Sequence, residues 1–181
     1  MIQVKDVVKS FDGNVVLDHI SADFEDGKVN MIIGQSGSGK TVLMKSMIGL
    51  HQIDSGEIIF DTRHGKQNLA EMTEKEVRML HREVGMLFQG AALFDSMTVQ
   101  ENVMYPLEMF SDMSNQEMVE RAYFCLSRVN MPERAYNLMP SEISGGMQKR
   151  VAIARAIALN PRYLFCDEPN SGLDPKTSLV I

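Results

Sequence analysis

Residues 34–41, GQSGSGKT, limit the possible folds of this chain more than any other stretch. They match the pattern G-x-x-x-x-G-K-[ST], in which glycines let the backbone wrap phosphate groups with several N–H donors. An apolar run at 29–33 precedes the loop, and residues 41–50 after it are apolar nearly all round. This order predicts a buried strand, a phosphate-binding loop and a buried helix. Together they indicate an α/β fold that binds ATP or GTP.

The residues of this loop have separate expected roles. The Lys40 ammonium is expected to reach the β- and γ-phosphates, and the Thr41 hydroxyl to hold Mg²⁺. A glycine-rich turn before an ordinary helix is the alternative, and the eight matching positions with their strand and helix flanks argue against it. The residues predicted to contact the nucleotide here are Gly34, Ser36, Gly37, Ser38, Gly39, Lys40 and Thr41.

A second glycine-rich helix start lies at residues 143–150, ISGGMQKR. Ser144 offers a hydroxyl, and Gly145 and Gly146 leave the first N–H groups of a helix open to an anion. Because the chain already has one phosphate-binding loop, this second site predicts that one triphosphate is gripped from two sides.

A third motif is acidic: the apolar residues 163–166 lead directly to Asp167 and Glu168. Open α/β sheets bind ligands at the C-terminal ends of their strands. Asp167 suits the coordination sphere of Mg²⁺, and Glu168 could orient and deprotonate an attacking water. Two solvated acids at a strand end are the alternative, which is the weaker interpretation beside a phosphate-binding loop.

The remaining residues predict a β-rich start and a helical middle. Alternating residues indicate strands at 2–8 and 15–24 joined by a turn at 12–14, and apolar runs indicate strands at 57–62 and 84–88. Three helices are expected to begin with the same capping box, at Thr73 with Glu76, Thr98 with Glu101 and Ser114 with Glu117. We therefore predict one domain over 1–181, helical between about 95 and 160, with apolar stripes packing the helices together.

Composition excludes several classes of protein. The net charge of −6 comes without a basic run, so nothing predicts nucleic-acid binding. Cys125 and Cys166 are far apart and are expected to be small buried hydrophobes in a reducing cytosol. No apolar run is long enough to span a bilayer, which predicts a cytosolic polypeptide that can sit on a membrane partner.

Taken in order, these motifs resemble the nucleotide-binding domain of an ABC transporter. Residues 34–41 match its Walker A loop, and Gln89 after the run VGMLF matches its Q-loop glutamine. Residues 144–148, SGGMQ, resemble its LSGGQ element, Asp167 and Glu168 its Walker B end, and residues 171–174, SGLD, its D-loop. The resemblance covers essentially the whole chain.

The resemblance implies a P-loop NTPase core of RecA type, with an N-terminal antiparallel β subdomain and an inserted helical subdomain. It implies ATP and Mg²⁺ as cofactors, with Glu168 and Gln89 as catalytic residues. The implied metal residues are Thr41, Gln89 and Asp167, the last through water. Further nucleotide contacts implied by the family pattern are Phe11 stacking on adenine, Val16, Ser144, Gly145, Gly146 and Asp174.

It also implies partners. Family members associate head to tail, so Walker A of one copy faces the SGGM segment of the other. They dock on integral membrane permease subunits from the cytoplasmic side of the inner membrane. The expected docking groove is lined by Leu93, Phe94, Met97, Met104 and Tyr105. Two alternatives stay open: a soluble ABC-type ATPase, and a nucleotide-binding module without productive turnover.

One branch of the family is more similar in amino-acid sequence at two segments. Residues 86–99, MLFQGAALFDSMTV, and 102–107, NVMYPL, are similar to the ATPase of Mla/Mce-type lipid transporters. This similarity implies phospholipid transport between membranes.

The chain departs from the family pattern in two places. Met147 stands where the family has glutamine, with Gln148 following. After Asp174 only a few residues remain, whereas the family continues to a strand that ends in a switch histidine. The histidines, His19, His51, His64 and His81, do not fit that role. We therefore expect the C-terminal core strands to be missing, nucleotide binding to persist and full hydrolysis to be in question.

Overall fold

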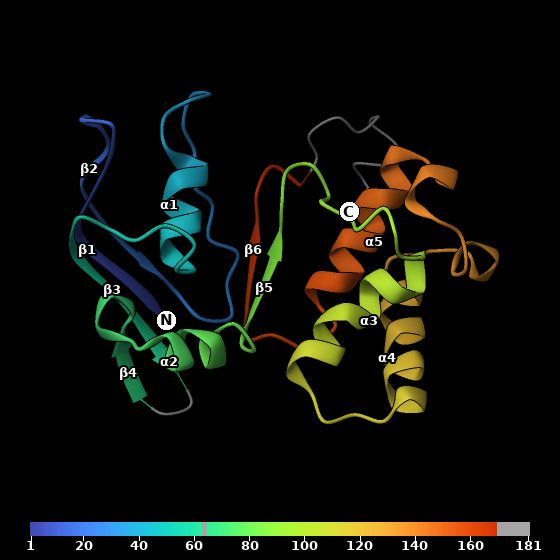
Figure 1. Ribbon diagram of the computed structural model, residues 1–181. Coiled ribbons are helices and arrows are strands. Elements are labelled where there is room, and N and C mark those ends of the chain that lie inside the picture. The colour runs from blue at the N-terminus through green and yellow to red at the C-terminus, as the bar shows by residue number, and fades with distance from the viewer. Residues whose placement is uncertain (63–64, 170–181) are drawn as a thin grey trace. The chain divides into compact units, whose positions relative to one another are not determined.

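The computed structural model describes residues 1–62 and 65–169 (Figure 1). The chain divides into two compact units, Met1–His81 and Arg82–Ile181. The first unit contains a four-stranded antiparallel sheet in the order β2-β1-β3-β4. Its elements are β1 (Ile2–Phe11), β2 (Asn14–Phe24), α1 (Lys40–Met47), β3 (Ser55–Thr62), β4 (Gly65–Asn68), η1 (Leu69–Glu71) and α2 (Glu74–Leu80). The expected antiparallel subdomain and its strands are confirmed, with β4 as an additional strand.

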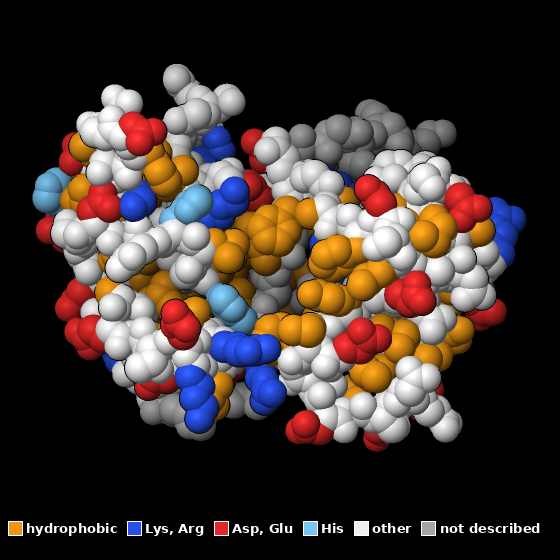
Figure 2. All heavy atoms as spheres, in the orientation of Figure 1, with side chains coloured by type: hydrophobic (Ala, Val, Ile, Leu, Met, Phe, Trp, Pro, Cys, Tyr) orange, Lys and Arg blue, Asp and Glu red, His pale blue; other side chains and the backbone are white. Residues whose placement is uncertain are grey.

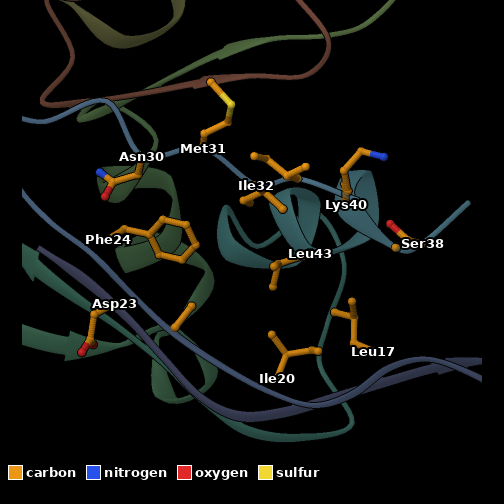
Figure 3. Close-up of a pocket in the computed structure, with 13 residues that line it drawn as sticks. Leu17, Ile20, Asp23, Phe24, Asn30, Met31, Ile32, Ser38, Lys40 and Leu43 are labelled. Atoms are coloured by element: carbon orange, nitrogen blue, oxygen red, sulfur yellow. The ribbon is translucent and has the colours of Figure 1, made fainter. Parts of the chain in front are cut away.

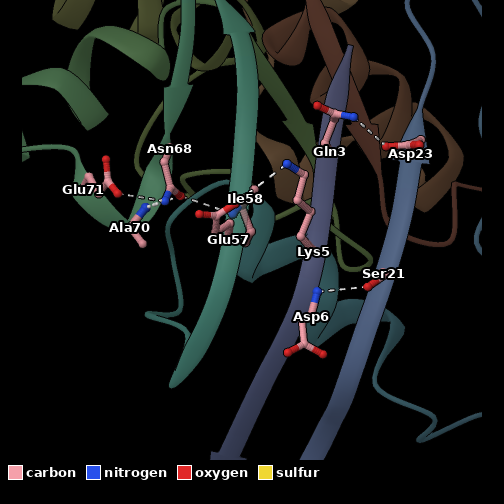
Figure 4. Close-up of polar contacts among 10 residues, drawn as sticks. All are labelled: Gln3, Lys5, Asp6, Ser21, Asp23, Glu57, Ile58, Asn68, Ala70 and Glu71. Carbon is pink, nitrogen blue, oxygen red and sulfur yellow. Dashed lines mark hydrogen bonds and ion pairs between the residues drawn. The ribbon is translucent and has the colours of Figure 1, made fainter.

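Apolar side chains on one face hold this sheet together. Val4, Val7, Ile58 and Phe60 are almost completely buried on its inner face. The outer face carries polar cross-strand contacts, which Figure 4 shows. Gln3 Nε2 donates to Asp23 Oδ1 across β1 and β2 at 3.1 Å.

The helix after the phosphate-binding loop ends as its sequence predicts. Gly49 has φ of 77°, and the Leu50 N–H donates to the Lys45 carbonyl oxygen at 2.8 Å. A left-handed residue with such a backward bond is a common helix end, and glycine adopts it at little cost.

Residues 29–33 are where the prediction of a strand is wrong. They pair with no strand of the described chain, and Val29 and Ile33 are 94% and 85% exposed. An apolar run becomes a strand only when a neighbour satisfies its backbone groups, and that pairing is not a property of the run itself.

The second unit combines a parallel strand pair with a helical cluster. Val84 lies opposite Tyr163 and Leu87 opposite Cys166 in the ladder of β5 and β6. Its elements are β5 (Val84–Leu87), α3 (Val99–Phe110), α4 (Asn115–Arg128), η2 (Glu133–Ala135), η3 (Pro140–Glu142), α5 (Gly145–Ala156) and β6 (Tyr163–Cys166). Helices α3, α4 and α5 thus lie between these two strands, within the region predicted to be helical.

The helices of this unit share one apolar core. Val103, Leu107, Leu126 and Val151, from α3, α4 and α5, have no exposed surface. All three predicted capping boxes are formed, at the starts of α2, α3 and α4. They satisfy N–H groups that the helix itself leaves unbonded.

Some hydrophobic side chains of the second unit reach the surface. Figure 2 shows them among acidic side chains over α3 and α4, and the exposed ones include Met109, Tyr123 and Phe124. Cys125 is buried as predicted, but Cys166 is exposed. That prediction is wrong because alternate residues of β6 lie on a face that is only partly covered.

Candidate functional site

The phosphate-binding loop is held in shape by glycines that other residues could not replace. Gly37 and Gly39 have φ of 81° and 90°. A Cβ on Gly39 would lie 3.0 Å from the Val16 carbonyl oxygen and 3.2 Å from Leu17 Cδ2. The left-handed backbone and the close approach both require glycine at position 39. The loop therefore presents its N–H groups with β2 directly behind it.

Lys40 spans this loop. Its Nζ donates to the carbonyl oxygens of Gly34 at 2.9 Å and Gln35 at 2.8 Å. The ammonium is thus held beside the loop, on the first residue of α1, where phosphate oxygens could accept the same protons. Thr41 follows in the first turn of α1, at the end of a helix that favours anions.

A mainly apolar cavity of about 410 Å³ lies behind the loop. Figure 3 shows the side chains of Leu17, Ile20, Phe24 and Leu43 around it, with Ser38 and Lys40 at one end. Its apolar lining does not suit a triphosphate.

Phe11, the residue expected to stack on adenine, lies at the end of β1 with 38% of its surface exposed. The His51 ring forms a T-shaped pair with it, with centroids 5.4 Å apart and an interplanar angle of 77°. Lys9 Nζ lies 5.2 Å from the Phe11 ring centroid. The ring is therefore held by neighbours and keeps surface for a base to stack on.

The acidic strand end gathers residues that are distant in sequence. Gln89 Nε2 donates to Glu168 Oε2 at 2.8 Å across a separation of 79 residues. Asp167 is only 5% exposed, and its N–H donates to the Leu87 carbonyl oxygen at 2.9 Å, which extends the β5–β6 ladder. The structure thus brings Gln89 to the carboxylate that the sequence predicted as the base.

The expected metal residues offer chemistry that fits Mg²⁺. Thr41 has a hydroxyl oxygen, Gln89 an amide oxygen and Asp167 a carboxylate. Mg²⁺ prefers oxygen ligands and takes most of them from phosphates and water. The described residues contain no group of three or more His, Cys, Asp or Glu side chains that could hold a metal.

The start of α5 is the second predicted anion site. Ser144 caps it, with its Oγ accepting from the Met147 N–H at 3.3 Å. The Gln148 N–H donates to the Ser144 carbonyl oxygen at 2.9 Å. The N–H groups of Gly145 and Gly146 lie before this bond and are left open by the helix, as an anion site requires.

The departure at position 147 has a structural reason. Met147 packs against the helical core of its unit. The following Gln148 turns the other way, and its Nε2 donates to the Pro140 carbonyl oxygen at 2.8 Å. A thioether suits the first position and an amide the second.

Two basic residues near the acidic strand end were missed by the sequence interpretation. Lys149 is only 4% exposed, and its Nζ donates to the Glu168 carbonyl oxygen at 3.0 Å. Arg155 donates to the carbonyl oxygens of Ala92 at 2.7 Å and Ala91 at 2.8 Å. The only signal was that neither belongs to the apolar stripe predicted for the helix from Gly145, which consists of Met147, Val151, Ala154 and Ala158. Asp174 and the rest of the D-loop lie outside the described residues.

Comparison with known proteins identifies the family. The family model described as "ABC transporter" matches residues 17–171, most of the chain. This chain belongs to the ABC transporter family. Within the part that the structure describes, no helix is long and apolar enough to cross a membrane.

Several ABC proteins are similar over the whole chain. The methionine import ATP-binding protein MetN of Clostridium acetobutylicum is 39% identical over 181 residues, covering 100% of this chain and 55% of MetN. The glutamine transport ATP-binding protein GlnQ of Escherichia coli K12 is 43% identical over 178 residues, covering 97% and 71%. The chain spans about half the length of the MetN relatives it matches.

A solved ABC structure has the same fold. The dimeric ATP-binding cassette MJ0796, in a post-hydrolysis state bound to ADP and Pi, superimposes with a TM-score of 0.91 at 32% identity. The match covers 100% of this chain and 79% of that one. The predicted α/β cassette with an antiparallel β subdomain and helices is therefore confirmed.

Proposed function

We propose that this chain binds and hydrolyses ATP to energise a membrane ABC transporter. The observation that carries the proposal is the contact between Gln89 and Glu168 at the end of β6. It joins a polar amide and a carboxylate beside the buried Asp167, in a chain whose other unit carries a complete phosphate-binding loop. Membership of a family of ATPases supports the same activity.

The chain's own residues divide the reaction between them. Lys40 and the N–H groups of the loop hold the phosphates, and Phe11 offers a ring for the base. Bound Mg²⁺ supplies positive charge that offsets the charge of the phosphates. Glu168 orients a water and accepts its proton, while the Gln89 amide fixes the direction of that carboxylate.

We further propose that two copies act head to tail. Ser144, Gly145 and Gly146 of one copy would hold the γ-phosphate bound by the other. Each charge-assisted bond to that group contributes about 1.5–3 kcal/mol. The two copies would therefore bind each other more tightly with ATP than with ADP. The solved relative MJ0796 is dimeric, which supports the arrangement. Asp174 would belong to the same interface.

The partner on the membrane is proposed to be a permease subunit on the cytoplasmic side of the inner membrane. Of the expected groove residues, Phe94 is 40% exposed, and its ring lies 4.7 Å from that of Tyr105. Met104 is buried and serves the core. Aromatic side chains held in place by their neighbours suit a docking surface. Co-purification with an integral membrane protein tests this partner against a soluble ABC-type ATPase, which would purify without one.

We propose that the transported substrate is a phospholipid. This proposal rests only on the similarity of residues 86–99 and 102–107 to the ATPase of Mla/Mce-type lipid transporters. The relatives MetN, GlnQ and PotA are named for methionine, glutamine and spermidine/putrescine, which makes a small polar nutrient the competing cargo. Reconstituting the chain with its co-purified permease separates the two. ATP turnover stimulated by phospholipid acceptor vesicles supports the lipid, and stimulation by amino acids or polyamines alone refutes it.

The central test uses Glu168→Gln, which is isosteric but cannot accept the proton. ATP affinity should stay the same while phosphate release falls by about 10²–10⁴-fold. Arg128→Gln, on α4, is the control and should leave the rate unchanged. Equal turnover by Glu168→Gln and the unmodified chain would remove Glu168 from the role of base. If the unmodified chain binds ATP but releases no phosphate, the alternative function, a nucleotide-binding module without productive turnover, is favoured.

A further inference from the structure

The backbone is held in an unfavourable conformation at Glu168 and in the segment that follows Gln89. Glu168 itself has φ of 47°, and Ala91 and Ala92, just after Gln89, have φ of 61° and 49°. Side chains other than glycine disfavour this left-handed region. Such conformations persist only where surrounding contacts fix them, and they gather at functional sites.

The contacts that fix them come from one helix. On α5, Lys149 Nζ donates to the carbonyl oxygen of Glu168 at 3.0 Å. Arg155 lies six residues further along α5 and donates through Nη1 to Ala92 at 2.7 Å and through Nη2 to Ala91 at 2.8 Å. Glu168, Ala91 and Ala92 therefore each have a carbonyl oxygen that accepts a hydrogen bond from a cationic side chain of α5.

Lys149 is buried and Arg155 is half-buried, so water competes less for their bonds to the backbone than it would at an exposed site. Lys149 is only 4% exposed, and burial lowers the pKa of the Arg155 guanidinium. A buried cation is costly unless its protons are bonded, and carbonyl oxygens in a dry environment bond them well. Apolar residues would pack α5 as well against its neighbours, so packing alone does not account for a lysine and an arginine here.

We propose that Lys149 and Arg155 are positioning residues for ATP hydrolysis, which hold Glu168 and the segment after Gln89 in register with α5. The inference rests on the proposed function. Because α5 begins at the Ser144 anion site, a small displacement of this helix would move the base and its orienting amide together. Anion binding at Ser144 and alignment of Glu168 are thereby connected through one rigid element.

The helical unit supplies a matched control. Arg121 Nε donates to the carbonyl oxygen of Ala158 at 2.8 Å and its Nη2 to that of Ile157 at 3.0 Å. This is the same guanidinium–carbonyl arrangement at the far end of α5. Arg121→Met removes two such bonds without touching the backbone of Glu168, Ala91 or Ala92.

The kinetic test compares Lys149→Met, Arg155→Met and Arg121→Met. The first two should lower kcat about 10- to 100-fold, because small misplacements of a catalytic group have effects of that size. KM for ATP should stay within about threefold of the unmodified value. Lys149→Arg should recover most of the rate. Arg121→Met should lower the melting temperature while leaving kcat unchanged.

A readout without activity makes the inference independent of turnover. Hydrogen exchange followed by mass spectrometry should show faster exchange in 88–94 for Arg155→Met and in 166–169 for Lys149→Met. Arg121→Met should change neither segment. Equal exchange in all variants, or losses of kcat that follow melting temperature across all three, would overturn the inference. Absence of turnover in the unmodified chain would instead refute the proposed function, and exchange alone would then decide the positioning role.

Discussion

Replacing Asn102 by alanine should destabilise the second unit by about 3 kcal/mol, although the residue touches no expected ligand. Asn102 lies on α3 with no exposed surface. Its Oδ1 accepts from the Phe94 N–H at 2.8 Å. Its Nδ2 donates to the carbonyl oxygens of Phe94, Met97 and Thr98 at 3.0–3.1 Å. The Asn102 side chain thus bonds backbone groups of the loop before α3, which is neither helix nor strand.

The magnitude follows from the groups left without partners. Removing the amide leaves the part-buried Phe94 N–H unbonded, and such a group costs about 1–3 kcal/mol where water does not replace its partner. The carbonyl oxygens lose less because each keeps a second lone pair, and the Thr98 oxygen still accepts from the Asn102 N–H at 2.9 Å. The loss is worth about 2–4 °C of melting temperature per kcal/mol in a chain of this size, or roughly 6–12 °C.

Tyrosine fluorescence is the appropriate assay. The chain has no tryptophan, and its tyrosines, Tyr105, Tyr123, Tyr136 and Tyr163, all lie in the second unit. Thermal unfolding followed at their emission therefore reports this unit even where the two units unfold separately. Asn115→Ala, at the exposed start of α4, is the control and should change the free energy of unfolding by less than about 0.5 kcal/mol.

A second substitution tests the direction of the hydrogen bonds. Asn102→Asp keeps the shape but turns a carboxylate oxygen toward carbonyl oxygens, so it should destabilise at least as much as alanine at pH 8. Folding would raise the pKa of that buried carboxyl, so stability should rise as pH falls and the acid becomes a donor. A loss under 1 kcal/mol for Asn102→Ala, or an Asp variant as stable as the unmodified chain at pH 8, would refute the reasoning.

Three further outcomes are expected. Ser144→Arg should leave the nucleotide affinity of a single copy nearly intact and abolish Mg-ATP-dependent dimerisation on a sizing column, and normal dimerisation would contradict the head-to-tail arrangement. Gly39→Ala should weaken ATP binding at least tenfold, or by about 1.4 kcal/mol, because the alanine methyl group would meet the Val16 carbonyl oxygen. Unchanged ATP affinity in calorimetry would refute that account. Hydrogen bonds from Ser10 lower the pKa of Asp54 from 3.8 to about 2. The contribution of Asp54 to stability is therefore present above pH 3.8 and is lost as pH falls toward 2. Asp54→Asn should flatten acid unfolding curves in that window.

The sequence predicted the elements whose causes are local. A Thr98 side chain and a Glu101 three residues later form a capping box wherever a helix begins. Gly37 and Gly39 favour the loop at residues 34–41 because glycine adopts its left-handed backbone angles at little cost. The order of the motifs was enough to indicate the family.

The sequence predicted less well wherever a partner decides the outcome. Residues 29–33 have the composition of a strand, yet within the described chain they pair with none. Cys166 was expected to be buried and is exposed, because burial depends on what covers β6. Neither result can be read from the residues themselves, since strand pairing and burial are made by distant parts of the chain.

The sequence by itself determined which chemical groups this protein has for its proposed reaction: the loop at residues 34–41 with Lys40, a glycine-rich helix start and an acidic strand end. Only the tertiary structure decided how the groups of the second unit are aimed. Gln89 meets Glu168 across 79 residues, and Lys149 and Arg155 bond the backbone beside them. The reason is physical. Residue types fix what bonds a side chain can make, whereas burial and chain topology fix which partner is within reach.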